Sequence, residues 1–397
     1  MKYNTNLFSQ TLKIVAREKL DNFAFLNGIS SHNKGFTPWD HFVSMLFCQF
    51  SGTKSLREIV NGLKSCTGKL NHLGMNLAPS KSNLAYSNKE RSYRLFEDVF
   101  YNLLEQCRQL KPGRKKKFHF KHKLYSMDAS IIDLCISIFD WAHYRETKGA
   151  IKLHLILDHD GYLPCFAHIT TGKVHEVTVA QTMRFQPGSI IVMDRGYTDY
   201  ELFYRWTQEK VYFVTRTKSN VQYQVHVDRA FPSGKNIISD QEILFTTPAS
   251  KKKCPAVMRR VAVWDPEKER EIVLLTNNLK LAASTISEIY KDRWEIESFF
   301  KTIKQNLKIK TFVGTSANAV KIQVWTALIS ILLIKYLRFV SRSGLSLSNL
   351  VSLLKLNLFT YKDLWLWIDD PFEKSNSPPD IQQEINFRTA RNSELTK

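Results

Sequence analysis

Three acidic residues, far apart in the sequence, lie in segments that would hold their side chains rigidly. Asp128 and Asp194 each follow a run of apolar residues with the composition of a buried β-strand. Glu297 lies in a segment with a helical period. Three carboxylates delivered by two strands and a helix can hold a pair of divalent cations, the arrangement that in-line phosphoryl transfer requires. These three acids are therefore the candidate catalytic and metal-binding set.

The segment from Tyr290 to Lys304 separates its polar and apolar residues by helical period. At about 100° per residue, Arg293, Glu297 and Lys304 fall within roughly 40° of one another. The adjoining face is apolar and consists of Ile296, Phe299, Phe300, Ile303 and Leu307. Glu295 lies more than about 100° from the polar strip, so Glu297 is the better candidate.

Several features of these segments have more than one interpretation. Thr285 followed by Glu288 has the form of a capping box, which predicts a helix start just ahead of Tyr290. A solvated surface helix would also carry Lys, Arg and Glu on its wet side, and an aspartate at a strand end often caps a turn. Four nearby acids also stay open as ligands, namely Asp133, Asp140, Asp158 and Asp160.

The 397-residue chain is strongly basic, with a formal charge of +20 and an isoelectric point near 9.6. Such an excess attracts polyanions, so nucleic acid is the leading partner and an anionic membrane surface is the competing one. The longest apolar run, Val324–Ile334, has about 11 residues against the roughly 20 needed to cross a bilayer. It predicts a buried core helix and no membrane partner.

The N-terminus and the cysteines indicate the compartment. Residues 1–6 contain no apolar signal segment, which predicts a cytoplasmic protein that joins the nucleoid when bound to DNA. The six cysteines are scattered, with no Cys-x-x-Cys pair and no clustered histidines. This pattern argues for reduced thiols and against a zinc site.

Residues 1–110 are expected to form an all-helical domain. Apolar periods predict helices over Thr11–Phe25, Trp39–Phe50, Leu56–Leu63 and Tyr93–Leu110. The polar segment 79–92 is either a solvated helix or the second helix of a helix-turn-helix. In the second case the DNA-facing residues would be Lys81, Asn83, Tyr86, Ser87 and Lys89.

Residues 111–123 are a predicted basic linker, because Pro112-Gly113 ends the preceding helix and the Lys/Arg run needs counter-charge. It either stays solvated or contacts phosphates. Beyond it the period changes to strands, which predicts an α/β fold with a mixed sheet and acids gathered at one edge. The expected strands cover 123–128 with 131–138, 151–158, 163–170, 189–194 and 211–217, and the expected helices cover 177–184 and 199–210.

The remaining chain is expected to comprise a β-rich insertion, helices and a tail. The insertion covers 218–278, with strands at 221–227, 243–247, 259–264 and 271–275. Within it, Trp264 could stack on an unpaired base, although core packing or turn anchoring is the favoured alternative. Helices are expected over 324–339 and 345–358, which places a C-terminal helical region at 336–370. Residues 371–397 have the composition of a disordered tail.

Four residues match a known signature in type and spacing. Tyr290, Arg293, Glu297 and Lys304 are separated by two, three and six residues, which resembles the Tyr-Arg-Glu-Lys signature of bacterial DDE transposases of the insertion-sequence-four family. The segments around Asp128 and over 194–199 (Asp-Arg-Gly-Tyr-Thr-Asp) resemble the family's two aspartate motifs. Residues 148–154 resemble the strand between these motifs, and the resemblance spans about 120–335.

This resemblance implies an RNase H-like catalytic core over 124–335, preceded by a helical domain over 1–110 that binds the element ends. It implies that the three acids bind two Mg²⁺ ions, for which Mn²⁺ can substitute. It also implies that Arg293 and Lys304 hold phosphates near the cut, and that Tyr290 contacts the same backbone or a distorted terminal base.

The function that the resemblance implies is DNA transposition. The enzyme would bind the terminal inverted repeats of its insertion sequence, cut the DNA there and join the 3′ ends to target DNA. Its partners would be double-stranded DNA and a second copy of the chain, because two ends must be joined together. One alternative is an RNase H-like nuclease that only cleaves. The other is a transposase-derived repressor or architectural protein without catalysis, against which the presence of all three acids counts.

Overall fold

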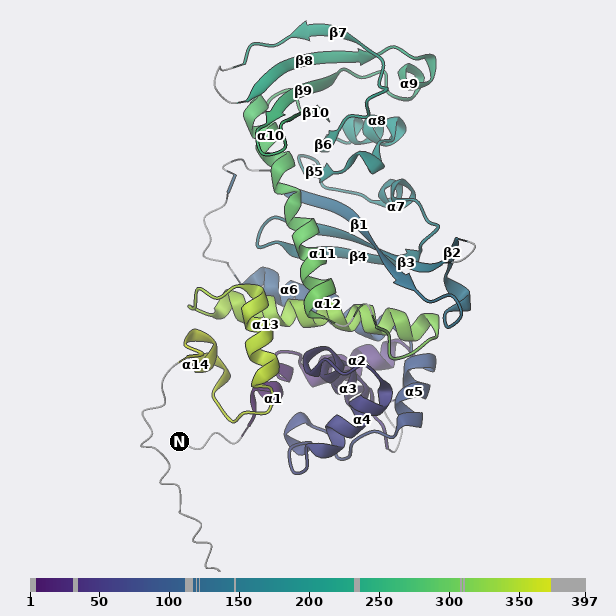
Figure 1. The fold of residues 1–397 in the computed structure, drawn as a ribbon, viewed down its shortest axis with the longest axis vertical. Helices are drawn as coiled ribbons and strands as arrows, with labels where there is room; N and C mark the ends of the chain where they lie inside the picture. Colours follow the sequence, from purple (N-terminus) through teal and green to yellow (C-terminus); the bar gives the residue numbers. More distant parts are fainter. Residues whose placement is uncertain are drawn as a thin grey trace, which may run out of the picture.

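The computed structural model describes residues 5–30, 35–110, 117–118, 120, 122–145, 148–231, 236–307, 309 and 311–372. The predicted linker residues 111–116 and the predicted tail from residue 373 lie outside this described part. Within it the chain is a mixed α/β protein with one large mixed sheet, helices that precede the sheet in sequence and helices that follow it (Figure 1). This arrangement confirms the predicted mixed α/β fold with helices before and after the sheet.

The N-terminal segment is helical where the structure describes it. Its elements are α1 (Leu7–Leu12), α2 (Arg17–Leu26), α3 (Pro38–Ser51), α4 (Leu56–Ser65), η1 (Asn71–Leu73), α5 (Lys81–Glu90) and α6 (Arg94–Gln109). The prediction of one helix over Thr11–Phe25 is wrong. The amides of Ile14 and Val15 donate to carbonyls three residues back, at 3.2 and 3.0 Å, and this tighter turn separates α1 from α2.

Helix α3 is the central helix of this segment. The Thr37 side chain accepts a bond from the Asp40 amide, and the Asp40 carboxylate accepts one from the Thr37 amide, which together form a capping box. Gly52 ends the helix in the left-handed region at φ 74°, where a side chain would cost strain. Every residue from Pro38 to Phe50 is buried.

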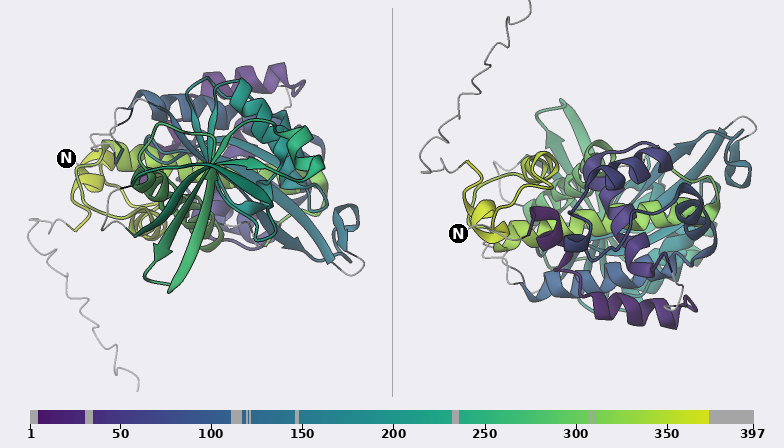
Figure 2. Two further views of the ribbon diagram at one scale, coloured as in Figure 1. Left: turned by 90° about the horizontal axis from the view of Figure 1, so that it is seen from above. Right: turned by 90° about the horizontal axis from the view of Figure 1, so that it is seen from below.

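Ten described strands form one sheet, in the order β2-β3-β1-β5-β6-β10-β9-β8-β7, with β4 paired to β3. The β1–β5 and β5–β6 pairs are parallel and the others are antiparallel. Seen from above, the strands fan around the viewing axis, which is the accumulated twist of the sheet (Figure 2). Their bounds are β1 (Leu124–Leu134), β2 (His143–Arg145), β3 (Lys148–Asp158), β4 (Leu163–Thr171), β5 (Ile190–Met193), β6 (Tyr212–Arg216), β7 (Tyr223–Asp228), β8 (Ile237–Phe245), β9 (Met258–Asp265) and β10 (Arg270–Thr276).

The first strand differs from its prediction. The sequence suggested two strands with a break after Asp128, but β1 is continuous and pairs with β3 from Tyr125 to Leu134. Asp128 is therefore inside a strand and not at its end. The short strand β2 was not predicted, whereas strands were predicted correctly at β3, β4, β5 and β6.

The segment 218–278 is strand-rich as predicted, and its strands extend the main sheet. Strand β10 pairs with β6, from Leu274 opposite Arg216 to Thr276 opposite Val214, so the sheet passes into this segment without interruption. The short helix α9 (Pro248–Lys253) lies between β8 and β9. The predicted domain limits stay a prediction.

Helices cover both faces of the sheet (Figure 1). On one face, α7 (Glu176–Thr182) and α8 (Tyr200–Gln208) pack in a core that includes Met127 and Ile156. On the other face, α10 (Ala283–Asp292) and α11 (Trp294–Asn306) follow one another along the sheet. The α10 residues Ile286 and Ile289 pack against Leu124, Ile190 and Val192.

The helix with the four-residue signature starts earlier than predicted and is divided. It begins at Ala283 after Ala282, which makes no side-chain cap, so the predicted Thr285 capping box is wrong. Arg293 separates α10 from α11. Its amide donates to the Tyr290 carbonyl at 3.2 Å, and the Ile296 amide donates to the Arg293 carbonyl at 3.2 Å, both over three residues.

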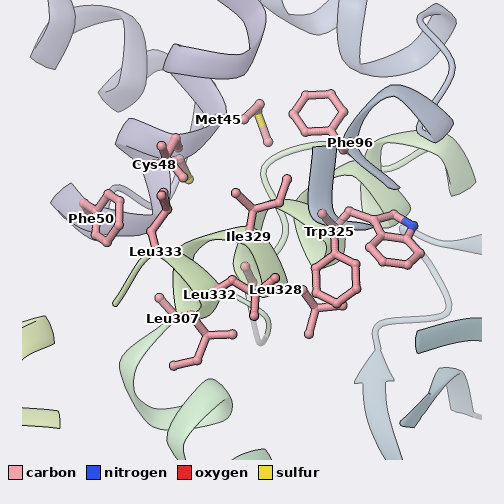
Figure 3. Close-up of a cluster of buried hydrophobic side chains, with 14 of the residues drawn as sticks. Met45, Cys48, Phe50, Phe96, Leu307, Trp325, Leu328, Ile329, Leu332 and Leu333 are labelled. Carbon is pink, nitrogen blue, oxygen red and sulfur yellow. The ribbon is translucent and has the colours of Figure 1, made fainter. Parts of the chain in front are cut away.

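Helix α12 (Ala317–Val340) packs against α3, α5 and α6 of the N-terminal segment and also against α11. Seen from below, it crosses the molecule behind the N-terminal helices (Figure 2). Figure 3 shows its side chains Trp325, Leu328 and Ile329 among residues of α3, α6 and the end of α11. Helices α13 (Leu347–Leu356) and α14 (Leu364–Asp369) follow.

By length and composition, α12 is the one described helix that could cross a membrane, and 83% of its apolar window is buried inside the protein. Burial of this kind is typical of a core helix, as the sequence predicted for Val324–Ile334.

We expect Leu328→Ala to lower the free energy of unfolding by about 2–5 kcal/mol, because the side chain is fully buried and its loss leaves a cavity. Leu356→Ala, in α13, makes the same chemical change at a side chain that is 81% exposed and should have little effect. Denaturant unfolding measures both. Equal effects would contradict the central place given to α12.

Candidate active site

The two candidate aspartates are neighbours because of the strand register. The parallel pairing of β1 with β5 runs from Leu124 opposite Ile190 to Met127 opposite Met193. Asp128 is the next residue of β1, and Asp194 directly follows the last residue of β5. Val192 and Leu124 face α10, and side chains two residues apart share a face. Both aspartates therefore lie on the side of the sheet that α10 and α11 cover.

Asp194 is held by the turn that follows β5. Its Oδ1 accepts a bond from the Gly196 amide at 2.8 Å, and its carbonyl accepts one from the Thr215 hydroxyl of β6 at 2.9 Å. A Cβ atom at position 196 would lie 2.9 Å from this Oδ1. A larger residue at this position would displace the carboxylate oxygen, so glycine suits the close approach in the Asp-Arg-Gly sequence after the strand.

Arg293 and Glu297 lie one helical turn apart and face the same aspartate. Nη2 of Arg293 contacts Oε1 of Glu297 at 2.5 Å, and Nη1 is 3.9 Å from Oδ2 of Asp128. The guanidinium lies over the ring of Tyr290, with its carbon 5.6 Å from the ring centre. Tyr290, Arg293 and Glu297 are thus brought together beside Asp128, as the helical period predicted.

The electrostatics of the site are dominated by the burial of one carboxyl group. Burial is the largest of the causes that together raise the pKa of Asp128 from its ordinary 3.8 to about 7, and the charges of Asp194 and Glu297 act in the same direction. The Ala129 amide, which donates to Asp128 at 2.8 Å, and the Arg293 charge act in the opposite direction. Burial alone would lower the pKa of Arg293, but Tyr290 and Glu297 raise it above its ordinary value.

A hollow of about 370 Å³ opens beside these groups, with Asp128, Glu297 and Lys304 in its wall. The Lys304 ammonium donates to the Ile131 carbonyl of β1 at 3.0 Å, which ties the end of α11 to the strand that carries Asp128. Lys301 also lines the hollow. A polyanion could reach the acids along this side of α11, where two lysines would meet it.

Only oxygen donors converge here, which is the ligand type that hard divalent cations prefer. In the described part of the chain, no three acidic, histidine or cysteine side chains are close enough to form a ready cation site. The Arg293 guanidinium lies between Asp128 and Glu297 and partly neutralises both. The donor set therefore fits a divalent cation, provided that Arg293 gives up its contact with Glu297.

The other acids that the sequence left open lie elsewhere. Asp158 and Asp160 both pair with Lys123, at 3.2 and 2.5 Å, near the start of β1. Asp133 and Asp140 are exposed. None of these four is among the residues that shift the pKa of Asp128.

Two tryptophan side chains are more exposed than the sequence indicated. Trp264 is 44% exposed near the end of β9, so it is not a core residue, and its role in base stacking stays a prediction. Trp294, which was not singled out, is 60% exposed and directly follows Arg293. The Lys268 ammonium lies 5.9 Å from its ring centre. Trp294 falls outside the apolar strip of the helix, so the helical period gave no reason to select it.

Helix α5 exposes most of the predicted DNA-facing residues. Lys81, Asn83, Tyr86 and Lys89 are exposed, but Ser87 is 2% exposed, so the prediction for Ser87 is wrong. Residues 66–80 separate α4 from α5 and include η1, whereas a helix-turn-helix needs a turn of about three or four residues. That motif in its compact form is therefore wrong here. DNA contact by Lys81 and Asn83 stays a prediction.

The sequence matches two known protein families. The family described as the transposase DDE domain matches residues 119–333, more than half of the chain, and a domain of unknown function (DUF4372) matches residues 4–76. The chain therefore belongs to the DDE transposase family, whose members cut DNA, transfer its strands and use divalent metal ions.

Curated relatives place the chain among bacterial insertion-sequence transposases of the type that the Tyr290 signature indicated. The chain is 29% identical over 292 residues to transposase y4zB of Sinorhizobium fredii, which covers 72% of this chain and 80% of that protein. It is 26% identical to the transposase of element IS5377 of Geobacillus stearothermophilus (64% and 67% covered) and 23% identical to that of element IS4SA of Synechocystis (66% and 73% covered).

We expect Asp128→Asn to stabilise the protein against heat when metal is removed by a chelator at pH 8. A pKa raised to about 7 means that stability is lost as pH rises through that value, because the buried carboxylate must ionise. The gain should be about 1 kcal/mol or more at pH 8 and should shrink toward pH 5. Thermal unfolding at both pH values measures it. Asp133→Asn, at an exposed aspartate of the same strand, should show no such gain.

Proposed function

We propose that Asp128, Asp194 and Glu297 are the catalytic residues of an RNase H-like transposase core. The observation that carries this proposal is the convergence of the three acids, because the register of β1 and β5 sets Asp194 beside Asp128 and Arg293 lies between Asp128 and Glu297 of α11. The raised pKa of Asp128, caused by burial and then by the two other carboxylates, agrees with it. Such crowding is unfavourable in the absence of a compensating cation. Two divalent cations, Mg²⁺ or alternatively Mn²⁺, would offset it and would activate the attacking oxygen and stabilise the leaving oxygen.

The signature residues of α10 and α11 would bind the DNA backbone at the cut. Arg293 has a buried Nε with no acceptor among the described residues, so it retains a donor for a phosphate oxygen. Lys304 extends the positive charge along the hollow beside Glu297. Tyr290 lies under the Arg293 guanidinium and would contact the same backbone. These side chains position the phosphodiester relative to the acids.

The substrate would be the terminal inverted repeats of the element. Residues 1–110 would bind these ends, residues 124–335 would cut both strands and join the 3′ ends to target DNA, and residues 336–370 would complete the fold. Two chains would act together, because both ends of one element must reach one target. The charge of +20 supports contact with long stretches of phosphate backbone in the cytoplasm.

We expect Asp128→Ala, Asp194→Ala and Glu297→Ala each to lower cleavage by at least about a thousandfold while end binding changes little, because each removes part of a charge-stabilising set. Glu295→Ala is the matched control. It removes a glutamate from the same helix turn, but Glu295 lines a different hollow, with Ser298 and Thr302.

The measurement is cleavage and joining of labelled element-end DNA by purified protein in Mg²⁺. Loss of joining alone would indicate that the acids serve only the second step. If the parent protein binds the ends but never cuts them, the non-catalytic repressor is the better function.

Lys81→Ala together with Asn83→Ala should weaken binding to element-end DNA about tenfold and reduce its dependence on salt, since each phosphate contact contributes to the salt slope. Both side chains are exposed on the first turn of α5. Lys19→Ala, at an exposed lysine of α2, tests whether any lost charge has the same effect. Fluorescence anisotropy at several salt concentrations measures the affinities, and equal losses in both proteins would exclude a specific role for α5.

A further inference from the structure

A buried chain of polar contacts lies directly behind the candidate active site. Nε2 of His159 is 2.7 Å from the Ser126 hydroxyl, and its Nδ1 is 2.6 Å from Oδ2 of Asp292. The Tyr162 hydroxyl donates to the same Asp292 oxygen at 3.2 Å, and Lys117 pairs with the other carboxylate oxygen. The contacts join β1, the turn between β3 and β4, and the end of α10. No sequence pattern indicated a role for Ser126, His159 or Asp292.

The order of these contacts is that of a hydrolase triad, but the burial excludes that chemistry. A nucleophilic serine must meet its substrate, and Ser126 is fully buried. The side chains of His159 and Asp292 are only 7% and 1% exposed. The burial of Ser126 therefore excludes a nucleophilic role, and the contacts link three parts of the protein to one another.

The chain of contacts connects α10 to β1 a second time, beside the contact between Arg293 and Asp128. Ser126 lies two residues before Asp128 on the same strand, so the two side chains share a face of the sheet. Asp292 is bonded covalently to Arg293, which faces Asp128. Two consecutive residues at the junction of α10 and α11 are thereby linked to two positions on β1.

The two links differ in strength. The Arg293–Asp128 contact spans 3.9 Å, which is too long for a hydrogen bond, whereas both contacts of His159 are short. Arg293 must also give up its contact with Glu297 when cations bind the acids, if the proposed function holds. The contacts of His159 with Ser126 and Asp292 involve none of the three candidate catalytic acids, so they persist through that change.

We propose that Ser126, His159 and Asp292 form a positioning unit, which holds the α10–α11 junction, and with it Arg293 and Glu297, at a fixed distance from Asp128 on β1. This proposal rests on the proposed function of the three acids. In it, Ser126, His159 and Asp292 contact neither the DNA nor a cation. Asp292 is the last residue of α10, directly before the interruption at Arg293, so its contacts anchor the junction of the two helices.

The test compares Ser126→Ala, His159→Gln and Asp292→Asn with the control Asp240→Asn. Asp240 is a matched residue, since it is also buried and also pairs with a cation, Arg259 at 2.7 Å, but it lies in β8. Three quantities are measured for each protein. They are the unfolding temperature, the single-turnover cleavage rate at saturating DNA, and binding of Mn²⁺ followed by electron paramagnetic resonance with Asp128→Ala as background.

The expected result separates positioning from stability. Asp292→Asn and His159→Gln should lower the cleavage rate about tenfold to a hundredfold at temperatures where they are folded, and should weaken the Mn²⁺ binding that depends on Asp128. DNA affinity should stay within about twofold, because a displaced helix leaves the distant end-binding surface intact. Asp240→Asn should lower only the unfolding temperature.

The proposal is overturned if Asp292→Asn behaves as Asp240→Asn does, with rate and Mn²⁺ binding unchanged in the folded protein. If Asp292→Asn does not fold, Ser126→Ala decides, because it removes one hydroxyl and should still lower the rate severalfold. Failure of the proposed function looks different. In that case Asp128→Ala, Asp194→Ala and Glu297→Ala would continue to cleave.

Discussion

The candidate site depends on a largely buried carboxylate, Asp128, which lies near two further carboxylates. The charges of Asp194 and Glu297 add to burial in raising the pKa of Asp128, and within the described part of the chain Arg293 is the cation that faces both Asp128 and Glu297. Such a site is unfavourable for folding, so the surrounding elements must hold it against repulsion. The parallel register of β1 and β5 holds two of the acids. The packing of α11 on the sheet holds the third.

Much of the candidate site could be predicted from the sequence, because its residues lie on regular elements. The helical period of the segment from Tyr290 placed Arg293 and Glu297 on one face, and the structure brings them together. A strand-like run ahead of Asp194 placed that acid at the end of β5, as observed. From the sequence alone, Asp128 and Asp194 could be placed only at the same edge of a sheet. Their direct proximity depends on the parallel register of β1 and β5, which is set by packing and not by either strand alone.

Other features depend on contacts that no local pattern contains. Continuity of β1 through Asp128 follows from its antiparallel pairing with β3, which a polar residue in the strand does not reveal. The break at Arg293 has no proline or glycine to announce it, and Asp292 at the end of α10 is bonded to His159 from a turn more than a hundred residues earlier. The extension of the main sheet by β10 likewise required knowledge of strand order.

The N-terminal helices and the candidate site share one hydrophobic core. Residues of α3 and α6 pack with α12, and the same continuous cluster includes Ile296, Phe300 and Ile303 of α11 and Leu153 and Leu155 of β3. A close-packed interior transmits displacement, because its side chains have no free volume into which to move. DNA ends bound by the N-terminal helices would therefore be held in a fixed place relative to Glu297.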